Sequence, residues 1–250
     1  GAPLRAPVGR GLLGRILDGL GRPLDESQKG LLRVEGTRSV DSRPPDPLSR
    51  APISEALPLG IPAIDGLITT GGGQRIGLFG EPGVGKSLLL SAIAKASSAD
   101  VAVIAMVGER GREVREFVDR VLGPEGMQRA IVVAATSDTS PLVRRRCAWA
   151  AMSVAEHFRD QGKQVLFLCD SLTRYADAHR NVALTAGEVP SLRAYPPSTF
   201  GALSSFCERA GPGVDNQGDI TAIFSVLVAG SNMEEPVADM VRGILDGHII

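Results

Sequence analysis

The sequence predicts an α/β fold in which a wound, mostly parallel sheet is flanked by helices. Short apolar runs alternate along the chain with segments of helical periodicity, a pattern typical of parallel strands that are buried on both faces. A glycine-rich stretch at residues 80–87 joins one such run to one such helical segment. The chain has 250 residues, of which 43% are hydrophobic and 22% charged, which is ordinary for a globular protein of this size.

The strands and helices can be placed in order along the chain. A helix is predicted at residues 88–94 and a second at 112–122, where a Gly-Pro pair should end it. Ser140 is a suitable N-cap, and Pro141 a suitable first residue, for a helix that runs to about residue 161 and stops at Gly162. Ligands of wound sheets bind at the carboxyl ends of the strands. The apolar runs predict buried strands at residues 75–79, 101–107, 131–135, 164–170 and 220–228.

The first part of the chain has a different composition. Residues 1–40 are rich in Gly, Arg and Leu and predict short elements broken by turns, and residues 41–58 hold five prolines, which indicates an extended connector. Three glycines at 71–73 mark the turn into the first core strand. We therefore expect a region at 1–57 that packs on a core domain at 58–250. The missing initial Met, and an end inside a strand-like run, suggest a piece of a longer chain.

Charge and cysteine content exclude some classes of function. The net charge is −1, so the overall charge gives no reason to expect binding to nucleic acid or to an anionic membrane. Three cysteines without a Cys-x-x-Cys pair are typical of a reduced, cytosolic protein. We see no apolar run long enough to cross a membrane. The three histidines lack the spacing of metal ligands, so no metal site other than one for Mg²⁺ is predicted.

The stretch GEPGVGKS at residues 80–87 fits the phosphate-loop pattern. Its glycines let the backbone turn tightly, so that successive N–H groups cradle phosphate oxygens at a helix N-terminus. Lys86 can reach the β- and γ-phosphates, and the hydroxyl of Ser87 can bind Mg²⁺. The alternative, a plain glycine-rich turn, explains the flanking strand and helix less well. The residues expected to contact ATP are Gly80, Gly83, Val84, Gly85, Lys86, Ser87 and Leu88.

Asp170 ends one of the buried strands and is the second candidate for the metal site. At the carboxyl edge of the sheet it would lie beside the phosphate loop, in the Walker-B arrangement, where it helps to hold Mg²⁺. The alternative is an N-cap for the following helix, a common role for Asp. The phosphate loop upstream favours the metal role.

Glu109 closes the strand that follows the phosphate loop, and it is the candidate catalytic carboxylate. From that position it can orient and polarise an attacking water molecule. The next acids, Glu113 and Glu116, are expected to be a solvated helix start, since acids are favoured in a first helical turn.

Arginines near these acids are the remaining candidates for residues that bind the phosphates. Arg110 and Arg174 are expected to bind phosphate charge, although Arg174 fits pairing with a neighbouring acid equally well. Three further arginines at residues 144–146 point in different directions at helical spacing, so a solvated helix face is favoured over an anion site.

These motifs resemble the ATPases of bacterial type III protein secretion and of flagellar protein export, which are relatives of the catalytic subunit of rotary ATP synthases. The resemblance covers nearly the whole chain. The segment at 170–176, with Arg180, is similar to the export branch. The other stretches that carry the resemblance are 52–55, 60–67, 73–79, 107–113, 195–198, 218–222 and 239–248.

The resemblance implies a RecA-like fold, ATP hydrolysis with Mg²⁺ and a homohexameric ring in the full-length protein. It also implies stalk and stator partners, chaperones and export substrates, no nucleic acid, and a cytoplasmic location at the inner membrane. Residues 1–57 would hold the last trace of an N-terminal barrel, and a helical C-terminal domain would follow. The family's arginine finger and adenine-stacking residue would lie beyond Ile250, so weak or absent turnover is expected from these 250 residues alone. Glu81 and Pro82 in the loop, and Asn181 in place of an acid, depart from the family pattern.

Other functions stay open at this point. A flagellar export ATPase is the main alternative to a secretion ATPase. An RNA-translocating ring and a non-catalytic nucleotide-binding subunit fit less well, because no basic aromatic module is present and Glu109 is retained. The long loop expected at residues 177–198, which includes Tyr195, should face a ring pore or a subunit interface.

Overall fold

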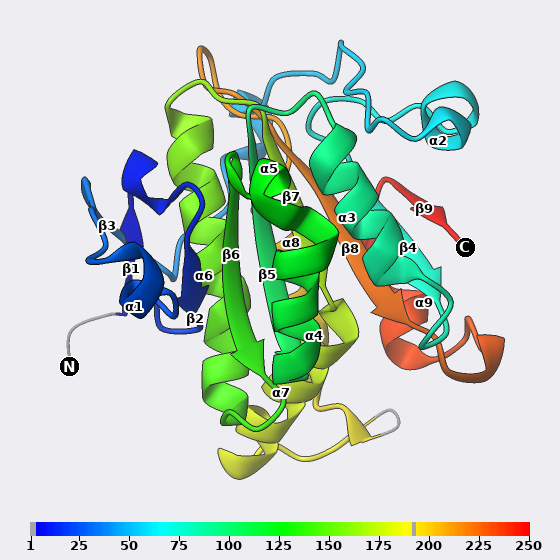
Figure 1. Ribbon diagram of the computed structural model, residues 1–250. Coiled ribbons are helices and arrows are strands. Elements are labelled where there is room, and N and C mark those ends of the chain that lie inside the picture. The colour runs from blue at the N-terminus through cyan, green and yellow to red at the C-terminus, as the bar shows by residue number, and fades with distance from the viewer. Residues whose placement is uncertain (1–3, 192–193) are drawn as a thin grey trace.

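The computed structural model describes residues 4–191 and 194–250, and a seven-stranded sheet runs through its centre (Figure 1). The strand order is β2-β6-β5-β7-β8-β4-β9, and every pairing of neighbours within the described residues is parallel. The wound parallel sheet predicted from the sequence is therefore confirmed. A separate antiparallel pair joins β1 (Arg5–Val8) to β3 (Gly36–Ser39).

The five predicted strands all form. They are β4 (Arg75–Gly80), β5 (Val101–Glu109), β6 (Ala130–Thr136), β7 (Val165–Asp170) and β8 (Ile220–Leu227). Strand β5 is longer than expected, because residues 108 and 109 continue it. Its residues are buried on both sides, with Val103 and Ala105 in one apolar cluster and Ile104 and Met106 in another. This double burial is why the strand reads as a continuous apolar run.

Two short strands were not predicted as part of the sheet. Strand β2 (Ile16–Asp18) pairs with β6, and β9 (Gly247–Ile249) pairs with β4. Residues 16–18 thus belong to the same sheet as the core, although the expected division of the chain lies at residues 57–58. The other elements of this region are η1 (Arg10–Leu12), α1 (Glu26–Lys29), η2 (Pro47–Ser49) and α2 (Pro62–Leu67).

Helices cover both faces of the sheet. Helices α6, α7, α8 and α9 share one apolar cluster with the sheet, and α2, α3, α4 and α5 share the other. Ser140 caps α6, and Pro141 is its first residue, as predicted. The helices are α3 (Lys86–Ala96), α4 (Gly111–Glu116), α5 (Gly123–Met127), α6 (Pro141–Asp160), α7 (Leu172–Thr185), α8 (Pro197–Cys207) and α9 (Pro236–Ile244). Like η1 and η2, η5 (Ala229–Ser231) is a short 3-10 turn.

Two expectations about these helices were wrong. The segment predicted as one helix at 112–122 is α4 followed by a π-helical turn, η3 (Phe117–Leu122), and α5 begins where the chain was expected to leave the helix. The physical reason is that Pro124 suits the first turn of a new helix.

About half of the long loop expected at 177–198 is helical, at 177–185 and 197–198. Helix α7 runs on to Thr185 and α8 starts at Pro197, because apolar residues at helical spacing bury one face of α7. Tyr195 is buried, and its hydroxyl donates to Asp177 at 2.8 Å. The shorter connection includes residues 192 and 193, which lie outside the described part of the chain. Its expected place at a pore or an interface stays a prediction.

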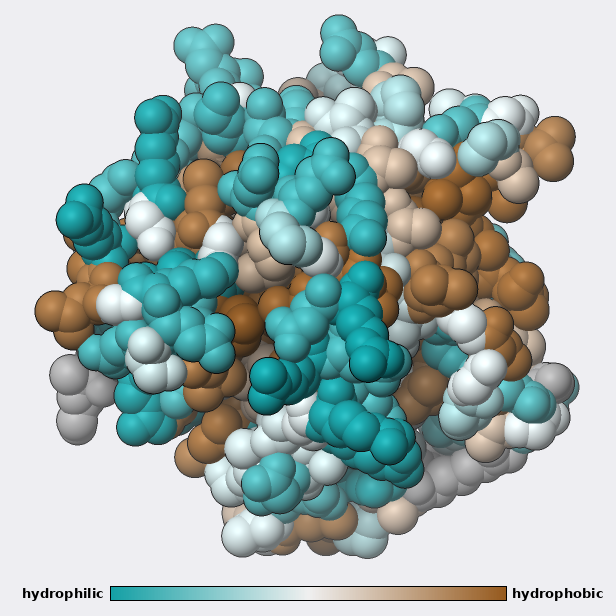
Figure 2. Space-filling model, in the orientation of Figure 1, coloured by the Kyte–Doolittle hydropathy of each residue, from teal (hydrophilic) through white to brown (hydrophobic). Residues whose placement is uncertain are grey.

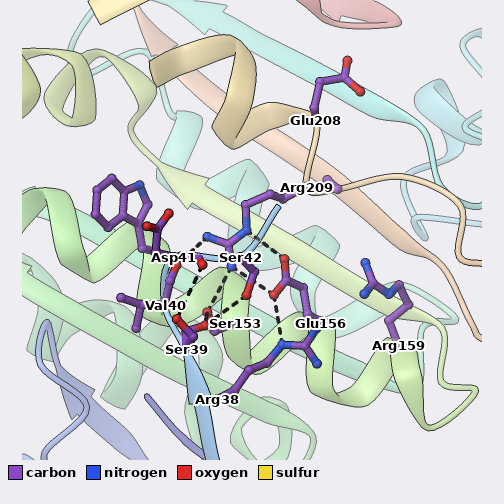
Figure 3. A network of polar contacts seen from close by, with 12 residues as sticks. Arg38, Ser39, Val40, Asp41, Ser42, Ser153, Glu156, Arg159, Glu208 and Arg209 are labelled. Carbon is purple, nitrogen blue, oxygen red and sulfur yellow. Dashed lines mark hydrogen bonds and ion pairs between the residues drawn. The ribbon is translucent and has the colours of Figure 1, made fainter. Parts of the chain in front are cut away.

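A buried polar network holds the N-terminal region on the sheet (Figure 3). Glu156 on α6 accepts two hydrogen bonds from Arg209, at 2.8 and 3.0 Å, and lies 3.2 Å from Nε of Arg38. Arg209 also donates to the carbonyl of Val40, and Ser153 donates to the carbonyl of Ser39. Charges and carbonyls from β3, α6 and the turn after α8 therefore satisfy one another, with Glu156 and Arg209 buried and Arg38 partly exposed.

Candidate functional site

The glycine-rich loop leads from β4 into α3 at the carboxyl edge of the sheet. Gly83 and Gly85 have φ angles of 85° and 100°, a left-handed conformation that residues with a side chain rarely adopt. A Cβ atom at either position would meet nothing within 4 Å. The loop therefore needs glycine for its backbone shape, and its surface faces open space.

Lys86 begins α3 and folds back over its own loop. Its Nζ donates to the carbonyls of Gly80 at 2.7 Å and Glu81 at 2.5 Å, and the residue is largely buried. Burial lowers the pKa of Lys86, while the charges of Asp170 and Glu109 oppose that effect. Its ammonium is thus held within the site, close to two carboxyl groups.

Ser87 and Asp170 meet as predicted, although they come from α3 and from the end of β7. The Ser87 hydroxyl donates to Oδ2 of Asp170 at 3.1 Å, and the Ser225 hydroxyl on β8 donates to Oδ1. The N-cap of α7 is Ser171, whose Oγ accepts from the N–H of Arg174, so Asp170 does not cap this helix. Ser225 lies in the middle of a buried strand, where no sequence signal marks it.

Glu109 is buried at the end of β5 beside Arg174. Its Oε1 lies 3.0 Å from Nε of Arg174, whose Nη1 donates to the carbonyl of Gly108 at 2.8 Å. The Nε–H is not aligned for a hydrogen bond to the carboxylate, so this contact is an ion pair. Of the two interpretations of Arg174 left open by the sequence, pairing with an acid is the one seen in the structure.

The pKa of Glu109 is raised to about 8. Burial is the largest cause, followed by a hydrogen bond with Glu113 and by the charge of Asp170, while Arg174 acts in the opposite direction. The hydrogen bond with Glu109 is also the main cause of a lowered pKa at Glu113. Glu113 was expected to be a solvated helix start. It does lie in the first turn of α4 with its side chain 37% exposed, but it also forms a hydrogen bond with Glu109, which was not expected. Glu116 is exposed, as expected.

One cavity of about 470 Å³ brings most of the predicted residues together. Arg110 lies at its rim with a mostly exposed side chain, 3.4 Å from Glu113. Gly80 contributes its carbonyl to Lys86, and Val84 is exposed on the loop. The cavity is lined by Pro82, Gly83, Gly85, Lys86, Ser87, Leu88, Glu109, Arg110, Glu113, Asp170, Arg174 and Leu227.

The three arginines at 144–146 are partly buried, which corrects the expectation of a solvated face. The guanidinium of Arg145 lies 4.8 Å from the ring centroid of Trp149. Its Nη1 also lies 3.4 Å from Nδ1 of His179 on α7. Within residues 4–191 and 194–250, no His, Cys, Asp and Glu residues gather into a further metal-binding cluster. In the same residues, no helix combines the length and the apolar composition needed to cross a membrane.

The parallel sheet, the glycine-rich loop and the Ser87–Asp170 pair define the class of P-loop nucleotide-binding domains. The chain belongs to the ATP synthase alpha/beta family, since the model of that family's nucleotide-binding domain matches residues 60–250. This confirms the family relationship and the P-loop fold that the sequence motifs predict.

Relatives come from both branches named by the resemblance. The chain is 50% identical to the flagellum-specific ATP synthase of Pseudomonas aeruginosa over 246 residues, which are 98% of this chain and 54% of that protein. It is 52% identical to the type 3 secretion system ATPase of Sinorhizobium fredii over 244 residues, which are 98% of this chain and 53% of that protein. The chain thus spans about half the length of the curated relatives it matches.

Solved structures of secretion ATPases have the same fold. A prototypical ATPase from the type III secretion system of pathogenic bacteria superimposes with a TM-score of 0.93 at 48% identity, over 98% of this chain and 70% of that chain. The assembled ATPase EscN from the type III secretion system of enteropathogenic E. coli gives a TM-score of 0.94 at 48% identity, over 100% and 60%. EscN in complex with its central stalk EscO gives 0.88 at 48% identity, over 98% and 58%.

Proposed function

We propose that this domain binds ATP together with Mg²⁺ and hydrolyses it. We further propose that the full-length protein uses this reaction to drive chaperone release, unfolding and export of proteins through a type III secretion apparatus. One observation supports the chemistry most strongly. The Ser87 hydroxyl and the Asp170 carboxylate, 83 residues apart in the chain, meet at 3.1 Å beside a glycine-rich loop, and buried Glu109 lines the same cavity.

The residues present fit a triphosphate and a hard cation. The open face of the loop at Gly83 and Gly85 leaves room for an anion to approach the backbone N–H groups. The hydroxyl of Ser87 and the carboxylate of Asp170 are oxygen ligands of the kind that Mg²⁺ prefers. The cavity of about 470 Å³ falls within the size range of small-molecule sites.

Each residue would then have a distinct task. Ser87 and Asp170 would hold Mg²⁺, which supplies charge neutralisation on the phosphates when bound. Lys86 would bind phosphate oxygens as a compact positive charge. Glu109 would orient water and accept its proton at a carboxylate oxygen. Arg110 at the rim and Arg174 at the base of the cavity would add positive charge.

Glu109 must be ionised to accept a proton, and its surroundings oppose ionisation. With a pKa near 8, the carboxyl group is mostly protonated at neutral pH in the structure as it stands. Glu109 loses this proton more readily beside a bound cation, because a nearby positive charge favours the carboxylate. The base would therefore become competent mainly when the site is filled.

The role of the whole protein is proposed from its relatives. By likeness to the assembled EscN and its complex with a central stalk, we propose a hexameric ring that contacts stalk and stator proteins, chaperones and export substrates at the cytoplasmic face of the inner membrane.

An apolar surface supports self-association. Leu67 and Ile68 at the end of α2 are 85% and 47% exposed, and Figure 2 shows apolar residues gathered on the side of the molecule where α2 and β9 lie.

Flagellar protein export is the second candidate for the process that the ATPase drives. Flagellum-specific ATP synthases of P. aeruginosa and Bacillus subtilis are 50% and 51% identical to the chain, close to the 52% of the S. fredii secretion ATPase. Restoring export in a bacterium that lacks its secretion ATPase, but not in one that lacks its flagellar ATPase, would support the secretion assignment. The reverse pattern would favour the flagellar one.

The catalytic assignment is tested with Glu109→Gln in the full-length protein. We expect kcat for ATP hydrolysis to fall by about 10²–10⁴-fold, the range for loss of a general base. Binding of Mg²⁺ with a non-hydrolysable ATP analogue should change by less than about threefold, because Gln retains the shape of the side chain. Glu116→Gln, at an exposed position at the end of α4, is the matched control. Unchanged kcat in Glu109→Gln would favour a non-catalytic nucleotide-binding subunit.

A further inference from the structure

The carboxyl end of β5 contains an irregularity next to the proposed base. Strand β5 pairs with β6 in regular register as far as Val107, which lies opposite Ala135, and then Glu109 lies opposite Thr136. Gly108 is therefore an extra residue on β5 with no partner on β6, which is a β-bulge. Bulges are common next to active sites, where they change the direction of a side chain.

The bulge changes the side of the sheet that Glu109 faces. Successive side chains of a strand point to opposite faces, so in an unbroken strand Glu109 would share the face of Val107. Val107 packs in the apolar cluster with α6 and α7. Glu109 instead lines a cavity together with Met106 and Ser87, on the side of α3. The extra residue is what brings the carboxylate to the side of the phosphate loop.

The backbone at this position requires glycine. Gly108 has a φ angle of 74°, in the left-handed region. A Cβ atom there would lie 3.3 Å from Cδ of Arg174 and 3.5 Å from Cδ of Arg144. Two arginine stems, from α7 and α6, therefore confine the bulge and leave little room for a side chain.

Hydrogen bonds hold the bulge on both sides. One guanidinium, that of Arg174, donates to the carbonyl of Gly108 at 2.8 Å and lies 3.0 Å from the carboxylate of Glu109. The carbonyl of Glu109 accepts from the N–H of Ser137 at 3.0 Å. Backbone and side chain of Glu109 are thus fixed together.

Resting on the proposed ATP hydrolysis, we infer that Gly108 is a positioning residue. Its bulge, held by Arg174, aims the carboxylate of Glu109 at the space beside Ser87 and Asp170. Gly108 touches no substrate in this account and acts only through Glu109. A substitution that straightens or displaces the bulge moves the base without removing it.

The test compares Gly108→Ala with Gly111→Ala in the full-length protein. Gly108→Ala places a side chain at a left-handed φ between two arginine stems, so kcat is expected to fall by about tenfold to a hundredfold, as for a misplaced catalytic group. KM for ATP should change by less than about threefold, because the phosphate loop and the metal ligands are untouched. A Cβ atom at Gly111 would meet Thr136 at an ordinary 3.8 Å, so this control should retain kcat within about twofold.

A pH profile separates positioning from simple loss of stability. Displacement of Glu109 from Glu113 and Arg174 should shift the acidic limb of kcat/KM in Gly108→Ala, and Gly111→Ala should keep the wild-type limb. A loss of melting temperature without that shift would overturn the inference, and so would kcat equal to that of Gly111→Ala. If Gly108→Ala does not fold, Gly108→Asn replaces it, because Asn adopts left-handed φ more readily. Its Cβ atom still lies against the stems of Arg174 and Arg144, so a smaller fall in kcat is expected, and kcat equal to that of Gly111→Ala would again overturn the inference. A wild-type protein without hydrolysis, or Glu109→Gln as active as wild type, would instead overturn the proposed function.

Discussion

Glu109 is the residue whose surroundings most directly control the proposed chemistry. Its pKa of about 8 results first from burial, then from the hydrogen bond with Glu113 and from the negative charge of Asp170. The pH dependence of kcat/KM reports ionisations of the free enzyme. Because a general base must be ionised, kcat/KM should rise with pH through the neutral range and level off above about pH 8.

Replacing Glu113 with Gln should move this limb to lower pH. Ionised Glu113 accepts a hydrogen bond from protonated Glu109, so it stabilises the protonated form and raises the pKa of Glu109. Gln has no charge to offer, and the pKa of Glu109 should therefore fall. The measurement is kcat/KM for ATP from pH 5.5 to about 9.5, a range that spans the titration of Glu109. Glu116→Gln should leave the limb unchanged, and a limb that stays in place in Glu113→Gln would contradict this explanation.

At the scale of single residues, the sequence identifies side chains that belong to a short motif or that end a clearly recognisable strand. Ser87 and Lys86 follow from the loop pattern, and Asp170 and Glu109 follow from their positions at strand ends. Glu113, Ser225 and the bulge at Gly108 could not be predicted in this way. Their importance depends on which side of a strand or helix meets the site, and this is set by packing between elements far apart in the sequence.

At the scale of elements, the polar network on α6 carries a prediction about stability. Glu156 is 1% exposed and accepts hydrogen bonds from Arg209 while it pairs with Arg38 (Figure 3). Replacing it with Ala leaves Arg209, whose side chain is 4% exposed, without its counter-charge in a buried position, while the partly exposed Arg38 keeps its pair with Asp160. Loss of one partner of a buried ion pair costs about 3–5 kcal/mol.

We therefore expect Glu156→Ala to lower the free energy of unfolding by about 3–5 kcal/mol in urea titrations. Glu116→Ala, which removes an exposed acid, should change it by less than about 0.5 kcal/mol. Equal unfolding free energies for the two variants would mean that the network does not anchor the region before residue 42 on the sheet.

Element prediction succeeded where apolar patterns are long. The five core strands and α6 have continuous runs or clear caps, so their existence follows from the sequence. Strand β2 has three residues and no such run, and it joins the sheet because β6 offers a free edge. The π-helical turn in η3 and the extent of α7 also depend on packing, which a helical pattern alone does not describe.

At the scale of the whole molecule, the wound parallel sheet and the family followed from the phosphate loop and its flanking elements. The comparisons bear out both. The sequence could not show which surface is left uncovered. Exposed Leu67 at the end of α2 and Leu88 beside the phosphate loop, 85% and 67% exposed, become apparent only in the folded chain. Apolar side chains at such positions suit a site that is completed by a neighbouring subunit.

The central claim is that this site hydrolyses ATP as part of a ring. Its most direct test is steady-state ATP hydrolysis by the full-length protein, measured against protein concentration across the range in which sizing shows assembly, with Glu109→Gln as the inactive reference. We predict that activity per molecule rises with concentration as subunits assemble, because a charge from a neighbour completes the transition state, an effect worth about 10³–10⁵ in other phosphoryl-transfer enzymes. Full activity per molecule in the dissociated state, abolished by Glu109→Gln, would show that one subunit holds the complete site and would contradict the ring mechanism.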